Sequence, residues 1–240
     1  RGLLLISGST GHGKSTTAAA LVEWLNHTTA CHIVTLEDPI EFLFEEDRAV
    51  INQREIGVDT RSFSDGLKNA LRQSPDALFI SDLRDRETME AALLAAESGQ
   101  LVISCIHTTN ALTTIERLVS FFPPHQHPTI RFRLSLVLKG TLSQRLVPRR
   151  DGTGCVPACE VMVMTPAIRQ CVREWEASQI STLIREGQLQ GMQTLTAALH
   201  RLVQMGWITA EEALRTADSP DELDLLLRNV RASREVSDIK

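Results

Sequence analysis

The sequence lacks the long apolar runs and the signal layout that mark membrane and secreted proteins. Its 240 residues contain no run of 18 apolar residues, the length that a membrane-spanning helix needs, and no N-terminal secretory signal. The formal net charge of −5 at pH 7 gives no reason to expect nucleic acid as a partner. Internal repeats and low-complexity tracts are also missing. These absences leave a globular chain with room for one large α/β domain, alone or with a small satellite.

Cysteines are few and scattered, at Cys31, Cys105, Cys155, Cys159 and Cys171. An odd count spread in this way predicts reduced thiols in a cytoplasmic protein. Cys155 and Cys159 are the one closely spaced pair, so the chain cannot assemble a four-cysteine zinc site. We therefore expect no structural zinc.

The two ends of the chain differ in character. Only Arg1 and Gly2 precede the first apolar run, an abrupt start that is typical of the interior of a longer protein, and we expect an upstream domain. Residues 233–240 are polar, and we expect them to fray.

The most informative stretch is GSTGHGKS, residues Gly8–Ser15, which directly follows the apolar run Leu3–Ile6. It matches G-x-x-x-x-G-K-S in the strand–loop–helix setting that gives this pattern its meaning. The glycines allow a tight loop whose backbone N–H groups converge on a phosphate, and the following helix N-terminus adds partial positive charge. Lys14 is expected to reach the β- and γ-phosphates, and Ser15 to offer its hydroxyl to Mg²⁺. The residues expected to hold a nucleoside triphosphate are Ser9, Thr10, Gly11, His12, Gly13, Lys14, Ser15 and Thr16.

Short apolar runs alternate with helical patterns in the first half of the chain. Strands are predicted at Leu3–Ser7, His32–Leu36, Ala77–Ser81 and Leu101–Ile106, and helices between them at Ser15–Leu25, Ser64–Gln73 and Glu87–Ser98. The strands are of the kind that is buried on both faces. The alternation predicts βαβ units and therefore an α/β fold with a mainly parallel sheet. Ligands of such sheets bind beyond the carboxyl ends of the strands.

Three of these strands end in polar residues that would meet at that edge. Asp82 follows one strand and is expected to hold Mg²⁺ directly or through a water. Glu37 and Asp38 follow another, where one carboxylate would act as general base for the attacking water; the alternative is a turn with solvated acids. His107 ends a third strand and could contact the γ-phosphate, although a lone histidine is more often structural.

Phosphoryl transfer also gains from a guanidinium that neutralises transition-state charge, often one from a neighbouring subunit. Arg54, Arg72 and Arg84 lie close in sequence to the segments above. The sequence does not distinguish among these three candidates.

Beyond Pro128 the pattern becomes mostly helical, apart from a hairpin predicted at Leu142–Val147 and Cys159–Met164 with an exposed connecting loop. The change favours a division of the chain into residues 1–165 and a smaller helical C-terminal region, residues 166–240. Helices in that region are predicted at Ala167–Glu174, Ser178–Glu186, Leu195–Met205, Ala210–Arg215 and Asp221–Asn229.

Four segments, in this order, resemble the secretion-type ATPases of type II secretion and type IV pili. The glycine-rich loop is similar to the Walker A motif of that family. Leu36–Glu41 (LEDPIE) resembles its aspartate box, Ser81–Thr88 (SDLRDRET) its Walker B motif, and Ile106–Thr108 (IHT) its histidine box. With further matches at Gln53–Gly57 and Ala70–Arg72, the resemblance covers the chain from residue 3 to about residue 122.

The resemblance implies a RecA-like P-loop core that hydrolyses ATP with bound Mg²⁺. By this resemblance, Glu37 would act as general base for the catalytic water and Asp82 would hold Mg²⁺. His107 would be the histidine-box residue. The resemblance also implies a ring, a homo-hexamer, in the cytoplasm at the inner-membrane base of a pilus. The implied partners are an inner-membrane platform protein of the pilus machine and a paralogous retraction ATPase. The family's N-terminal PAS-like domain, which packs on the next subunit, is missing from this chain.

The second half of the chain is similar to pilus retraction motors. Thr165–Glu174 (TPAIRQCVRE) and Gly191–Leu195 (GMQTL) resemble segments of the PilT type, whereas Ala217–Leu223 (ADSPDEL) resembles the accessory PilU type. The sequence leaves both types open. Assembly motors of the same superfamily carry a four-cysteine zinc module, so a pilus assembly or type II secretion ATPase is the less favoured alternative.

Two positions depart from the family pattern. Ser81-Asp82 stands where the family has Gly-Glu, which draws the carboxylate back by about one methylene at a place where shifts near 1 Å matter. His12 stands where the family commonly has serine, at a variable position of the motif, and we expect little harm. The leading hypothesis is an ATP-hydrolysing motor for pilus retraction and twitching motility. The shortened acid favours the other candidate, a weakly active ATP-binding subunit that acts with a paralogous motor.

Overall fold

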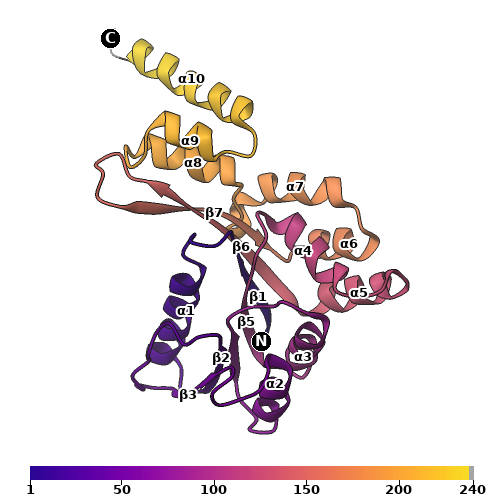
Figure 1. Ribbon diagram of the computed structural model, residues 1–240. Helices are drawn as coiled ribbons and strands as arrows, with labels where there is room; N and C mark the ends of the chain where they lie inside the picture. The colour runs from indigo at the N-terminus through magenta and orange to yellow at the C-terminus, as the bar shows by residue number, and fades with distance from the viewer. Residues whose placement is uncertain (238–240) are drawn as a thin grey trace.

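A seven-stranded sheet runs through the computed structural model, which describes residues 1–237 (Figure 1). The strand order is β3-β2-β4-β5-β1-β6-β7, and neighbouring strands are parallel except in the antiparallel hairpin β6–β7. The predicted α/β fold with a mainly parallel sheet is therefore confirmed. The strands are β1 (Gly2–Ser7), β2 (His32–Glu37), β3 (Val50–Glu55), β4 (Ala77–Ile80), β5 (Leu101–Ile106), β6 (Leu138–Pro148) and β7 (Cys155–Val163).

One strand, β3, was not predicted from the sequence. Its residues VINQRE are mostly polar, so they form no apolar run. The strand lies at the edge of the sheet, pairs with β2 alone and leaves Val50 exposed. A search for strands that are buried on both faces cannot find it.

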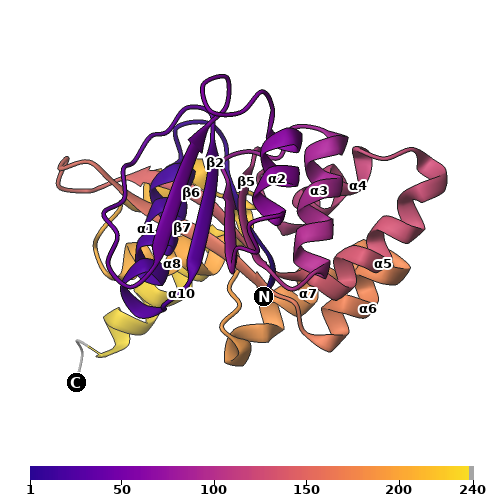
Figure 2. The same cartoon turned by 90° about the horizontal axis from the view of Figure 1, so that it is seen from below.

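Helices cover both faces of the sheet, as Figure 2 shows with α1 on one side of the strands and α2 and α3 on the other. Successive strand residues point to opposite faces. Leu78 and Ile80 of β4 therefore join the apolar cluster under α2 and α3, whereas Ala77 and Phe79 pack on the α1 side. The elements before β6 are α1 (Lys14–Thr28), α2 (Phe63–Leu71), α3 (Arg86–Glu97), α4 (Ala111–Ser120), the 3₁₀ turn η1 (Pro124–Gln126) and α5 (His127–Val137).

Side-chain caps fix where several of these helices begin. Ser62, Asp85, Asn110, Thr165 and Thr194 each accept the backbone N–H of the residue three positions further on. Each bond satisfies one of the free N–H groups of a first helical turn. The helix starts are therefore encoded locally by Ser, Thr, Asp and Asn.

The apolar packing continues across the predicted boundary at residue 165. Ile168, Cys171 and Val172 of α6, with Ile180 and Ile184 of α7, belong to the same cluster as the sheet. The division of the chain at 165/166 stays a prediction. After β7 come α6 (Pro166–Glu174), α7 (Ala177–Glu186), the 3₁₀ turn η2 (Gly187–Gln190), α8 (Leu195–Gln204), α9 (Ala210–Thr216) and α10 (Pro220–Ser237).

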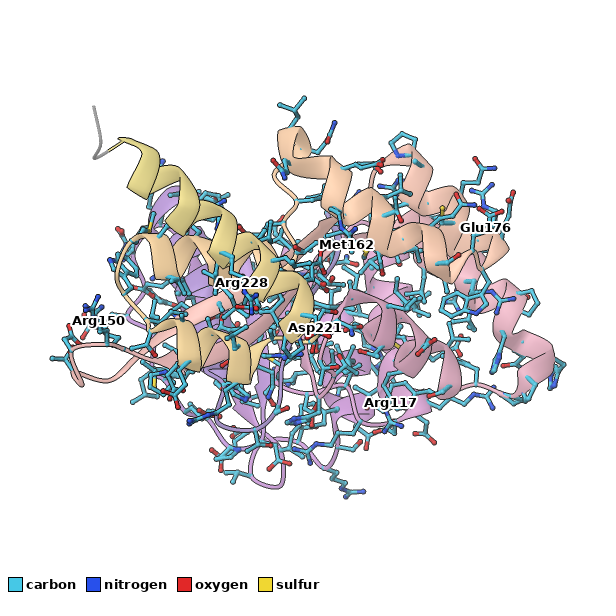
Figure 3. The ribbon with its side chains drawn as sticks, turned by 90° about the horizontal axis from the view of Figure 1, so that it is seen from above. Arg117, Arg150, Met162, Glu176, Asp221 and Arg228 are labelled. Carbon is cyan, nitrogen blue, oxygen red and sulfur yellow. The ribbon has the colours of Figure 1, made fainter. Side chains whose placement is uncertain are left out.

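A second apolar cluster joins the far end of the β6–β7 hairpin to α8, α9 and α10. Val147 and Val156 of the hairpin pack there with Leu199 and Leu223 of the helices. Figure 3 shows Arg150 at the tip of the hairpin and Glu176 on the opposite side of the molecule. None of the helices in residues 1–237 combines the length and apolar character that a bilayer-spanning segment requires.

The end of the chain differs from the prediction. The helix predicted at Asp221–Asn229 lies within α10, which continues to Ser237 through residues that were expected to fray. The expectation for residues 238–240 lies outside the described residues.

Candidate functional site

A cavity of about 540 Å³ lies at the carboxyl ends of the parallel strands, where the sequence placed the site. That volume is within the usual range for small-molecule sites. The loop after β1, the acids after β2 and β4 and the histidine after β5 all contribute to it. The lining residues are Thr10, Gly11, Gly13, Lys14, Ser15, Thr16, Asp38, Glu41, Ser81, Asp82, Arg84, Cys105, His107 and Leu146.

The phosphate loop, residues 8–15, leads directly into α1. Gly13 caps that helix with φ +76°, a left-handed conformation that suits glycine. A Cβ at Gly13 would also lie 2.9 Å from Nε2 of Gln144, and a Cβ at Gly8 would lie 2.6 Å from the Gln144 carbonyl oxygen. The glycines therefore permit both the turn and the close approach of β6 behind it. The helix N-terminus faces the cavity, a favourable place for an anion.

Lys14 is buried at the floor of this loop, with 8% of its surface exposed. Its ammonium donates a hydrogen bond to the backbone oxygen of Ser9 at 3.0 Å. Nδ1 of His107 lies 3.3 Å from the same nitrogen. Burial lowers the pKa of Lys14, while the carboxylates of Asp82 and Glu41 act in the opposite direction. A charged ammonium held by two neutral acceptors can exchange them for phosphate oxygens.

His107 bridges the two sides of the cavity. Its Nδ1 faces Lys14, and its Nε2 lies 3.6 Å from Oδ2 of Asp82. This arrangement fits the neutral tautomer in which Nδ1 accepts and Nε2 carries the proton. Cys105, two residues earlier on β5, also lines the cavity. Burial raises the pKa of its thiol to about 12, so the thiol stays protonated at neutral pH.

Asp82, the predicted Walker B acid, is engaged by Arg84. Nε of Arg84 donates to Oδ2 of Asp82 at 2.8 Å, and Nη1 donates to Oδ2 of Asp38 at 2.9 Å. The hydrogen bond to Asp82 raises the pKa of Arg84 above its ordinary value. Ser81, which stands where the family has glycine, accepts the backbone N–H of Asp38 with its hydroxyl at 3.2 Å.

Glu41, to which the sequence gave no role, pairs with the predicted metal ligand Ser15. The Ser15 hydroxyl donates to Oε1 of Glu41 at 2.9 Å. Ser15, Glu41 and Asp82 thus bring one hydroxyl and two carboxylates to the same cavity. This all-oxygen donor set fits Mg²⁺, which takes few protein ligands and completes its shell with waters and substrate phosphates. In residues 1–237 no group of three or more His, Cys, Asp or Glu side chains is arranged to hold a metal alone.

Glu37, the predicted catalytic base, lies beside the cavity and does not line it. Its side chain is buried, and Oε1 accepts hydrogen bonds from the Thr35 hydroxyl at 2.6 Å and from Nε2 of Gln53 at 3.2 Å. Its neighbours Asp38 and Glu41 do line the cavity. The role of Glu37 as general base stays a prediction.

The candidate arginines separate in space. Arg84 lines the cavity, whereas Arg54 on β3 and Arg72 at the end of α2 do not. The predicted roles of these three in the transition state remain predictions. Two residues of the predicted phosphate loop do not line the cavity. Ser9 accepts the Lys14 hydrogen bond with its carbonyl oxygen, and His12 faces β6.

Residues from β6 were missed by the sequence analysis. Leu146 lines the cavity, and Gln144 contacts the phosphate loop from behind. The hairpin itself was predicted, but the sequence contains no signal that it lies beside the loop, because that adjacency comes from strand order. Both residues lie more than 100 positions from the loop that they contact.

Comparisons with known proteins agree with this geometry. The model of the family described as type II/IV secretion system protein matches residues 1–215. Over 221 residues the chain is 45% identical to the type IV pilus retraction ATPase PilT of Pseudomonas aeruginosa, covering 92% of this chain and 64% of PilT. It is 41% identical over 228 residues to the type IV pilus ATPase PilU of the same organism, covering 95% of this chain and 60% of PilU.

A solved structure is similar in three dimensions. The crystal structure of the pilus retraction motor PilT with bound ADP matches with a TM-score of 0.87 at 43% identity, covering 93% of this chain and 63% of that one. The chain spans 64% and 60% of the lengths of the PilT and PilU proteins that it matches.

Proposed function

This chain belongs to the type II/IV secretion system protein family, and on that premise we propose that it hydrolyses ATP to drive type IV pilus retraction and twitching motility. The observation that carries the proposal is the convergence of the phosphate loop, Lys14 and Asp82 on one cavity. The similarity to PilT and PilU over more than nine-tenths of the chain favours the retraction type of motor.

ATP would bind with its phosphates on the loop. The N–H groups of residues 8–15 and the N-terminus of α1 supply the anion site, and Lys14 leaves the carbonyl of Ser9 for the β- and γ-phosphates. His107, already in contact with Lys14, would then lie beside the γ-phosphate. Ser15, with Asp82 and Glu41, would hold Mg²⁺, which neutralises charge on the β- and γ-oxygens.

Water attack on the γ-phosphate requires a proton acceptor in line with it. We assign that role to Glu37, whose buried side chain would have to move to reach the cavity that it does not line. Asp38 and Arg84, which line the cavity and contact each other, would rearrange with it. The products are ADP and phosphate.

Assembly and location follow from the same family membership. We propose a homo-hexamer at the cytoplasmic face of the inner membrane, with the platform protein of the pilus machine and a paralogous retraction ATPase as partners. Arg54 and Arg72 lie away from the cavity of their own chain, and in the proposed ring they would serve the site of a neighbouring subunit.

A weakly active accessory subunit is the second candidate. It is favoured by the contacts of Asp82, whose shorter carboxylate is held by Arg84 within the same chain. A carboxylate with this partner must give it up before it can serve Mg²⁺, which would slow turnover.

Measurement of ATP hydrolysis tests the proposal. The full-length protein should turn over ATP, and Lys14→Ala should lower both nucleotide affinity and turnover by about 100-fold or more, because a water cannot replace the buried charge on two phosphates. Arg173→Ala, on the far helix α6, is the control and should change neither. Equal affinity and turnover in Lys14→Ala and the parent would contradict the assignment of the phosphate loop.

A further inference from the structure

The side chain of Gln144 lies directly behind the phosphate loop. It projects from β6 and is buried, with 4% of its surface exposed. Its Nε2 donates to the backbone oxygen of His12 at 2.8 Å, and its Oε1 accepts from the Thr17 hydroxyl at 2.8 Å. The thiol of Cys159, opposite on β7, lies 3.8 Å from the same oxygen. Gln144 therefore joins the loop, the first helix and the hairpin.

The contacts fix the orientation of this amide. The oxygen of His12 belongs to a carbonyl and can only accept, so the NH₂ group of Gln144 must face it. The hydroxyl and the thiol on the other side can both donate to Oε1. A flipped amide would instead place two acceptors, Oε1 and the His12 carbonyl oxygen, against each other at the loop.

The bond to His12 also sets the direction of the next N–H group. The peptide between His12 and Gly13 is trans, and in a trans peptide the C=O and N–H bonds point in opposite directions. Because Gln144 holds the His12 carbonyl toward β6, the N–H of Gly13 points away from β6. Gly13 lines the cavity, so its N–H is presented to a phosphate there.

A second contact from β6 holds the same residue. The backbone N–H of Leu146 donates to Nδ1 of His12 at 3.0 Å. Gln144 and Leu146 are two positions apart, so their side chains share one face of the strand, and a Cβ at Gly13 would lie 2.9 Å from Nε2 of Gln144 and 3.6 Å from Cδ1 of Leu146. Arg145, between them, points the other way and donates to the carbonyl oxygen of Thr216 at 2.6 Å.

We propose that Gln144 is a positioning residue for nucleotide binding: it holds the His12–Gly13 peptide so that the loop is arranged for the β-phosphate before the nucleotide arrives. The proposal rests on the proposed function, since it needs the loop to bind phosphate. Without the Gln144 amide, the His12 carbonyl loses its partner, and the Leu146 contact to the His12 ring alone holds the peptide less firmly. Part of the binding free energy must then be spent on ordering it.

Competition for bound fluorescent ADP tests this role, with ADP and AMP as competitors. Gln144→Met keeps the length of the side chain and removes both hydrogen-bonding groups. We expect affinity for ADP to fall roughly tenfold, the effect of losing one buried hydrogen bond that leaves a carbonyl unpaired. The affinity for AMP, which has no β-phosphate, should fall much less. The ratio of ADP affinity to AMP affinity should therefore be lower in the variant than in the parent.

Gln193→Met is the matched control. Like Gln144, Gln193 donates from Nε2 to a backbone carbonyl. Its acceptor is Cys159 of the hairpin, at 2.8 Å, and not a residue of the phosphate loop. This variant should bind ADP as the parent does and should show a similar change in melting temperature without nucleotide. Gln144→Asn, which keeps an amide on a shorter arm, should also weaken ADP selectively and replaces Gln144→Met should the latter not fold.

The outcomes separate the inference from the function on which it rests. Unchanged ADP affinity in Gln144→Met, an equal loss for ADP and AMP, or an equal loss in Gln193→Met would each overturn the positioning role. Lys14→Ala, measured alongside, should weaken the binding of fluorescent ADP itself by about 100-fold or more. If ADP affinity falls in Lys14→Ala but not in Gln144→Met, the proposed function stands and the positioning role of Gln144 alone is refuted. If Lys14→Ala binds ADP as the parent does, both the proposed function and the positioning role of Gln144 are refuted.

Discussion

The two sides of the cavity differ in how their functional groups are partnered. On the phosphate side, Lys14 contacts neutral acceptors only, and Gly13 caps a helix whose N-terminus faces the open space. On the acid side, Asp82 is held by the charged Arg84, and Glu37 by Thr35 and Gln53. The first set is ready to meet an anion, whereas Asp82 is engaged by Arg84 and the buried Glu37 must move to reach the cavity.

This difference separates binding from hydrolysis. A loop braced from behind by β6 can receive phosphates with little rearrangement, so nucleotide affinity should depend weakly on the acid side. Hydrolysis needs Glu37 and Asp82 in new positions, and such a step is a natural point for control by a neighbouring subunit. The predictions below test whether substitutions on the acid side change turnover and leave affinity alone.

Glu37→Gln should give the largest separation of the two properties. The amide keeps the shape of the side chain but cannot take a proton, so we expect turnover to fall by about 100-fold or more. Affinity for ATP, measured by fluorescent nucleotide binding, should be unchanged. Glu45→Gln, an exposed acid on the following segment, controls for the loss of a charge and should leave turnover as in the parent. Parental turnover in Glu37→Gln would leave Glu37 a structural residue at the end of β2 and place the base elsewhere.

Arg84→Met should have a smaller effect and act on the metal requirement. The guanidinium of Arg84 is half exposed and therefore holds Asp82 weakly, so its removal should lower the Mg²⁺ concentration for half-maximal hydrolysis by about threefold. Arg86→Met removes a charge from the same segment outside the cavity and should not shift that concentration. A large drop in turnover at saturating Mg²⁺ would instead show that Arg84 acts on the transition state.

Asp82→Glu should produce the smallest change, a modest increase in turnover. The substitution restores the residue typical of the family and extends the carboxylate toward the metal position by about one methylene, a distance that matters for positioned groups. Steady-state hydrolysis rates and ATP affinity of the parent and the variant are the measurements. Lower turnover would mean that the backbone at Ser81 has adapted to aspartate, and the weakly active candidate would lose its main support.

How much of this site the sequence could predict depends on whether the information is local. The phosphate loop, the strand ends and most helix starts are encoded within a few residues, so Lys14, Asp82 and His107 were placed correctly at one edge. The edge strand β3 was missed because it is polar. The contact of Arg84 with Asp82 could not be predicted from the sequence, because which side chains pair depends on three-dimensional packing.

Gln144 shows the same limit more clearly. It reaches the loop because β6 lies next to β1 in the sheet, a neighbourhood set by strand order and invisible in the local pattern. Glu41 is an intermediate case: it belongs to a recognised segment, but its pairing with Ser15 depends on how the chain turns after β2.

Titration of the protein with fluorescent ADP, once with Mg²⁺ and once with a chelator, tests the central claim most directly. If the phosphate side is arranged in advance and the acid side is not, removal of Mg²⁺ should weaken ADP binding by no more than about threefold, a change of less than 1 kcal/mol. ATP hydrolysis should stop under the same conditions. Loss of ADP affinity by much more than tenfold on chelation would contradict the account, because the acid side would then contribute to binding as strongly as the loop does.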